Sequence, residues 1–163
     1  MNWHSRWCTK TREGETAMST ITALRFADKG EAEQALNYRD PIKFVSEGEV
    51  VSMEEDSHGY LGKEIQRLTG SRIFQALEAW VPTGSDDGFA VSIYMDDEGK
   101  ITGRPIDMTA THATAALMEW GSILDAICGP IIVTLFDPET GSEKSMEDFH
   151  IKAVRNVLRG YAE

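Results

Sequence analysis

The chain has 163 residues, of which 41% are hydrophobic, so it is long enough for one domain with its own core. Its 27 acidic and 16 basic residues give a formal net charge of −11. A surface this acidic argues against nonspecific binding to nucleic acid or to anionic membranes, because both favour a basic face.

The cysteine content and the hydropathy pattern exclude two further classes. The two cysteines, Cys8 and Cys128, form no CxxC pair and no Cys/His cluster, which argues against a structural zinc site. Cys128 lies in an apolar context and is predicted to be a buried, inert thiol. No apolar run is long enough to span a bilayer, and the first residues lack the apolar core of a signal peptide. We therefore expect a cytoplasmic protein, in the cytoplasm of a bacterial host if the chain is of phage origin.

The first 17 residues differ from the rest of the chain. They contain few large hydrophobic residues and show no period, and Met18 would make a plausible alternative start. We expect residues 1–17 to be a flexible N-terminal extension and residues 18–163 to form a single domain.

Strand and helix signals follow one another along this domain. Alternation over Ser19–Phe26 predicts a strand, and Asp28 stands at capping-box spacing before a helix over Glu31–Tyr38. Residues Ile42–Met53 have β character and are interrupted at Glu47-Gly48, which predicts a hairpin. A helix that ends at Gly70 should then follow an acidic loop.

The second half predicts more strands than helices. The expected strands are Ile73–Val81, Phe89–Met95, a short one from Ile101 to Pro105, and Ile131–Phe136. The expected helices are Thr111–Trp120, which is rich in alanine, and a C-terminal helix capped by Ser145. This order predicts an α+β fold in which an antiparallel sheet packs against two or three helices in one compact domain.

A set of short pieces between Leu61 and Leu135 resembles a known family. These pieces are a helix ending in glycine, the turn Asp97-Glu98-Gly99-Lys100, the element Gly103-Arg104-Pro105, the step Ala110-Thr111, and the segment Asp125–Pro130 before a β-branched strand. Their order and spacing are similar to those of small phage- and plasmid-borne proteins grouped as a domain of unknown function (family number 3846). The resemblance implies an origin in a phage or another mobile element, and it brings no biochemical activity. Ile106–Thr109 departs from the polar or basic residues that many relatives carry after the proline.

No catalytic motif is present in the sequence. The four histidines are scattered, and the chain contains neither HExxH nor G-x-S-x-G. We therefore predict no catalytic residue, no metal site and no cofactor, and we expect the chain not to be an enzyme.

One group of residues is a candidate ligand site. Three threonines and a histidine surround the start of the predicted Ala-rich helix, where an anionic ligand would bind, and two cations of the preceding turn could pair with its charge. The candidate residues are Lys100, Arg104, Thr109, Thr111, His112 and Thr114. The same residues also suit simple helix capping and a polar surface.

The function predicted from these observations is that of a small acidic, non-enzymatic accessory protein of a phage or mobile element. It would bind and block a host factor, as a counter-defence inhibitor does, and its partner would be a host protein with a basic surface. No direct contact with nucleic acid or membrane is expected. An alternative is a small-ligand-binding protein that sequesters a nucleotide-like signal at the candidate site. A virion component is a third alternative, and homo-oligomer formation stays open.

Overall fold

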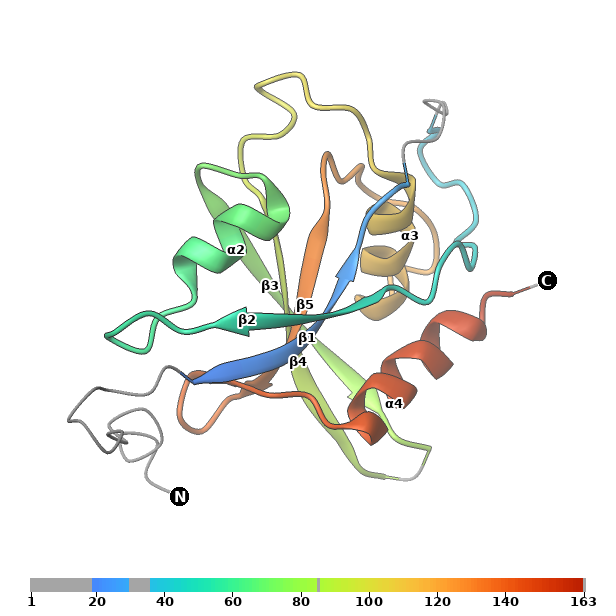
Figure 1. Ribbon diagram of the computed structural model, residues 1–163. Helices are drawn as coiled ribbons and strands as arrows, with labels where there is room; N and C mark the ends of the chain where they lie inside the picture. Colours follow the sequence, from blue (N-terminus) through green and yellow to red (C-terminus); the bar gives the residue numbers. More distant parts are fainter. Residues whose placement is uncertain (1–18, 30–35, 85, 163) are drawn as a thin grey trace, which may run out of the picture.

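An antiparallel sheet of six strands forms the centre of the molecule in the computed structural model, which describes residues 19–29, 36–84 and 86–162 (Figure 1). Five strands lie in the order β2-β1-β5-β4-β3, and β6 pairs with β5 outside this path. The strands are β1 (Thr20–Phe26), β2 (Glu49–Glu54), β3 (Phe74–Pro82), β4 (Gly88–Asp96), β5 (Ile131–Asp137) and β6 (Ser142–Lys144). The predicted fold class is confirmed: a single α+β domain in which three helices pack against an antiparallel sheet.

The helices lie on both faces of this sheet (Figure 1). They are α2 (Gly62–Thr69), α3 (Met108–Leu117) and α4 (Asp148–Arg159). Side chains alternate along β1, so that Leu24 and Phe26 join the core with α3 and α4, whereas Ile21 and Ala23 join a smaller core beneath α2. The alternating side chains of β1 therefore contribute to both apolar clusters.

The strand β6 lies beside the second half of β5. On the same side of β5, β1 pairs with the first half through Ile131–Val133, and β6 pairs with the second half from Leu135 to Asp137. Just beyond β6, the hydroxyl of Ser145 accepts a hydrogen bond from the Thr22 amide at 2.9 Å. The strand β6 therefore continues along β5 beyond the point where the pairing with β1 ends.

Most predicted elements are confirmed. These are the strands 19–26, 73–81, 89–95 and 131–136, the helix ending at Gly70, which has the left-handed φ of 68°, and the C-terminal helix. The Ala-rich helix forms three residues earlier than expected, because Asp107 caps it by accepting a hydrogen bond from the Ala110 amide.

Three predictions of local structure are wrong. Of the hairpin predicted over Ile42–Met53, residues 49–53 form part of β2, but residues 42–48 form no strand. The amides of Lys43 and Phe44 bond to His112 and to the Tyr161 carbonyl instead of to a neighbouring strand. The expected strand at Ile101 is a turn, closed by a bond from the Thr102 amide to the Glu98 carbonyl. Ser145 does not cap the last helix.

In its place, Glu147 is the N-cap of α4, and a reciprocal capping box joins it to His150. Most of the helix expected over residues 31–38 lies outside the described residues, and its described end, residues 36–38, is not helical. The N-terminal extension 1–17 also lies outside the described residues.

Candidate functional site

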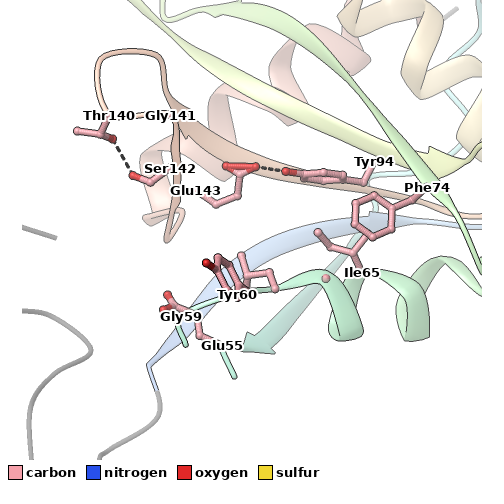
Figure 2. Close-up of a pocket in the computed structure, with 12 residues that line it drawn as sticks. Glu55, Gly59, Tyr60, Ile65, Phe74, Tyr94, Thr140, Gly141, Ser142 and Glu143 are labelled. Carbon is pink, nitrogen blue, oxygen red and sulfur yellow. Dashed lines mark hydrogen bonds between the residues drawn. The ribbon is translucent and has the colours of Figure 1, made fainter. Parts of the chain in front are cut away.

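A hollow of about 500 Å³ opens between α2 and the β5–β6 hairpin (Figure 2). The loop before α2 forms one wall, the hairpin forms the opposite wall, and strands β3 and β4 form the floor. The lining residues are Glu55, Gly59, Tyr60, Leu61, Gly62, Ile65, Phe74, Tyr94, Thr140, Gly141, Ser142 and Glu143. None of these positions belongs to the site predicted from the sequence.

Three aromatic rings contribute to the walls. Phe74 and Tyr94 meet edge to face on the floor, with 5.5 Å between ring centroids and 82° between ring planes. Tyr60, which is 66% exposed, stands at the rim. The hollow therefore offers apolar area and one accessible aromatic face.

A short acidic loop fixes the position of Tyr60. The carboxylate of Asp56 accepts hydrogen bonds from the amides of His58 and Tyr60 at 2.8 and 2.9 Å, and the Asp56 amide donates to the Tyr60 carbonyl. The bond from the Tyr60 amide is the main reason that the pKa of Asp56 is lowered. Hydrogen bonds within the loop thus hold the rim in place.

Glu143 places a carboxylate above the floor of the hollow. Its Oε1 accepts a hydrogen bond from the Tyr94 hydroxyl, whereas its Oε2 is buried and has no hydrogen-bond partner among the described residues. Burial raises the pKa of Glu143, although the Tyr94 and Ser92 hydroxyls partly lower it. Burial, and then the bond to Glu143, also raise the pKa of Tyr94. No cation among the described residues that line the hollow compensates the ionised form of Glu143.

Glu55 brings a second carboxylate to the hollow. It follows β2, is 2% exposed and lines the wall opposite the hairpin. The described residues that line the hollow include no lysine, arginine or histidine. The hydroxyls of Thr140 and Ser142 share a hydrogen bond of 2.7 Å with each other. The arrangement favours a ligand that brings positive charge or hydrogen-bond donors.

The two predicted cations are both engaged elsewhere. Lys100 pairs with Asp125 at the surface. Arg104 donates from Nη1 to the Asp96 carboxylate at 2.8 Å and to the Thr69 carbonyl at 2.9 Å. Neither side chain lies among the groups that contact the start of α3.

The start of α3 already carries a carboxylate of the chain itself. Asp28 accepts hydrogen bonds from the Met108 amide and from both the amide and the hydroxyl of Thr109, at 2.7 to 2.9 Å. Burial alone would raise the pKa of Asp28, but these bonds together lower it. Asp28 therefore takes the position at the helix N-terminus that an anionic ligand was predicted to occupy.

The remaining predicted residues are buried inside the domain. Thr111 and Thr114 are fully buried, and the hydroxyl of Thr111 accepts a bond from the Ile127 amide at 2.9 Å. His112 is 6% exposed, and its Nδ1 accepts a bond from the Lys43 amide at 3.0 Å. Burial, followed by the charge of Lys43, lowers the pKa of His112. The structure therefore does not gather the six predicted residues around one cavity, and ligand binding by them stays a prediction.

The Cys128 thiol is buried and free, as predicted, and burial raises its pKa. Within the part of the chain that the structure describes, no three His, Cys, Asp or Glu side chains are placed to hold a metal ion. No helix of that part is both long enough and apolar enough to cross a bilayer.

The chain matches no protein-family model, no curated protein and no solved structure. The resemblance to the phage- and plasmid-borne domain family therefore stays a prediction that depends on the short pieces between Leu61 and Leu135.

Proposed function

We propose that this chain is a non-enzymatic accessory protein of a phage or mobile element that binds and blocks a host protein with a basic surface. In this proposal, a lysine or arginine side chain of the host protein enters the hollow between α2 and the β5–β6 hairpin. The observation that carries the proposal is the composition of the hollow, in which three aromatic rings lie beside the carboxylate of Glu143 and no described lining residue is a cation.

A cationic side chain suits each part of this hollow. The apolar stem of lysine or arginine can pack on Phe74 and Ile65, and its charged end can lie against the ring of Tyr60. The charge would also lower the pKa of Glu143, because a nearby positive charge favours the ionised carboxylate. At longer range, the net charge of −11 attracts a basic partner and speeds its encounter.

The hydroxyl groups of the hollow support a binding role over a catalytic one. A serine nucleophile needs an adjacent base, yet among the described residues the hydroxyl of Ser142 bonds to that of Thr140 and not to a carboxylate or an imidazole. The alternative of a ligand-sequestering protein finds less support, because Asp28 already occupies the N-terminus of α3.

The proposal is tested by capturing host proteins with the tagged chain and then comparing two variants of one hairpin. Glu143→Gln removes the hairpin's carboxylate from the hollow, whereas Glu139→Gln removes an exposed carboxylate from the turn of the same hairpin. Both variants change the net charge equally. A charge-assisted hydrogen bond contributes about 1.5 to 3 kcal/mol, so the affinity for a captured basic protein should fall by about 10- to 100-fold in Glu143→Gln.

The matched control should stay within about two-fold of the wild type, because exposed charge pairs contribute little. Equal losses in both variants would show that only overall charge matters and would contradict a specific role for the hollow. Failure of the wild-type chain to capture any basic host protein would contradict the proposed function as a whole.

A further inference from the structure

Strand β3 forms one outer edge of the sheet. All nine of its residues pair with β4, from Phe74 opposite Asp96 to Pro82 opposite Gly88. No other strand of the described residues pairs with β3. One side of its backbone therefore has no partner strand within the described domain.

The hydrogen bonds at the two ends of β3 show which residues face this open side. The Asp97 amide donates to the Ile73 carbonyl at 3.0 Å, and the Thr83 amide donates to the Asp87 carbonyl at 3.1 Å. Residues of an antiparallel pair alternate between bonding to the neighbour and facing away. Since Ile73 and Thr83 bond toward the β4 side, the backbone groups that face outward are those of Phe74, Ala76, Glu78 and Trp80.

The open side has few of the features that usually prevent strand pairing. Natural edge strands are protected by charged residues, proline or bulges. Here the pairing with β4 runs without a bulge, Glu78 is the sole charged residue of the strand, and proline appears only at its end, at position 82. Trp80 is 57% exposed. The edge is thus long, regular and nearly uncharged.

We propose that a second copy of this chain pairs antiparallel with β3, so that two sheets join into one across a twofold axis. The low charge of β3 favours a second copy over a basic partner. The strand has a single carboxylate, so it offers a basic partner little attraction and repels a second acidic copy only weakly. An axis at Leu77 places Trp80 opposite Phe74 of the second copy. All four outward-facing residues then gain backbone hydrogen bonds, and the aromatic pair adds cross-strand contact.

Two substitutions at Ala76 test this pairing without removing a bond to β4. Ala76→Pro deletes one outward amide at a position where edge strands tolerate proline. Ala76→Glu instead places a new carboxylate opposite Glu78 of the second copy. Val50→Glu is the matched control, because Val50 is 49% exposed on β2, the strand at the other edge of the sheet.

The molar mass in solution is measured by light scattering after size-exclusion chromatography, over a range of protein concentrations. The wild type and Val50→Glu should reach the mass of a dimer, whereas both Ala76 variants should dimerise at least about tenfold more weakly. Circular dichroism checks that each variant is folded, and Ala76→Glu keeps the test valid if proline disturbs the strand. A monomeric wild type at several hundred micromolar, or an Ala76→Glu variant that dimerises as tightly as the wild type, would overturn the proposal.

Discussion

Asp28 and Asp107 cap the start of α3 together. Asp107 accepts bonds from the amides of Ala110 and Asp28, while Asp28 accepts bonds from Met108 and Thr109. From sequence spacing, Asp28 is expected to cap the helix that directly follows it. The sequence spacing does not predict this contact, because only the fold places Asp28 beside a helix that begins some 80 residues further along the chain.

Removal of the Asp28 carboxylate should therefore weaken the whole domain. Asp28→Ala leaves two helix amides and the Thr109 hydroxyl without this acceptor, which should lower the free energy of unfolding by about 2 kcal/mol. Urea unfolding at pH 7 measures the loss. The loss should shrink as the pH falls below the ordinary pKa of 3.8, because the stability that a lowered carboxyl pKa contributes is present above that value and lost in acid.

Asp86→Ala supplies the control for this prediction. Asp86 is exposed in the β3–β4 turn, so its removal should change the stability by less than about 0.5 kcal/mol. Equal stabilities of the Asp28 and Asp86 variants would show that Asp28 is not an essential cap.

Glu143 should have the opposite dependence on pH. Its pKa is raised in the folded state, mainly by burial, so folding disfavours the ionised form. The wild type should therefore lose stability relative to Glu143→Gln as the pH rises from about the ordinary pKa of 4.5 towards neutrality. Unfolding of both proteins at pH 4.5 and pH 7.5 measures this difference. A constant difference at the two pH values would contradict an uncompensated carboxylate in the hollow.

The elements that could be predicted from the sequence are those with a strong periodic pattern. Alternation predicted β4, which has one face against the larger core, and a continuous β-branched run predicted β5, which is buried on both faces. The strand β6 has three residues, too few to show a period, and it depends on pairing with β5. Helix α3 is buried from Thr109 to Leu117, so it has no polar face to reveal its limits. Consequently the fold class was predictable, whereas the hairpin that forms the candidate site was not.

Arg104 connects three elements and explains why a predicted binding residue has a structural role. Its guanidinium joins the end of α2, through Thr69, to the end of β4, through Asp96. It also packs on the backbone of Gly129 just before β5: a Cβ at that position would lie 2.6 Å from the Arg104 Cζ. Because both contacts depend on tertiary structure, the sequence showed only an arginine beside a turn.

Gly129→Ala should disturb this junction more than an alanine at an open glycine. At Gly129, with φ at +109°, backbone strain and the clash with Arg104 together should cost about 3 kcal/mol of unfolding free energy. Gly103→Ala is the control, because Gly103 also has a positive φ, +75°, but no neighbour near its Cβ, so about 1 kcal/mol is expected. Thermal or urea unfolding measures both, and equal losses would show that Arg104 does not restrict this position.

At the scale of the whole molecule, the net charge should act in opposite directions on the two proposed interactions. Salt screens attraction between the acidic chain and a basic host protein, so that binding should weaken between 50 and 500 mM NaCl. Salt also screens repulsion between two copies of charge −11, so dimerisation through β3 should strengthen over the same range. Affinity and molar mass measured on the same samples test both. Parallel changes in the two would contradict the opposite effects of charge proposed for them.

The candidate site depends on the fold of the whole molecule. The segments that line it come from residues 55–65, from β3 and β4, and from residues 140–143, and only the sheet topology brings them together. None of these residues forms a motif in the sequence. The acidic composition predicted a basic partner, but it did not indicate where on the molecule that partner would bind.

An NMR titration tests most directly whether the hollow binds a cationic side chain. The isotope-labelled chain is titrated with N-acetyl-arginine methylamide and N-acetyl-lysine methylamide, with the neutral N-acetyl-glutamine methylamide as control. We predict saturable shifts at Tyr60, Phe74, Tyr94 and Ser142 with a cationic probe, weaker in Glu143→Gln and absent with the neutral probe. Shifts spread evenly over the acidic surface, or unchanged signals around the hollow, would contradict the claim.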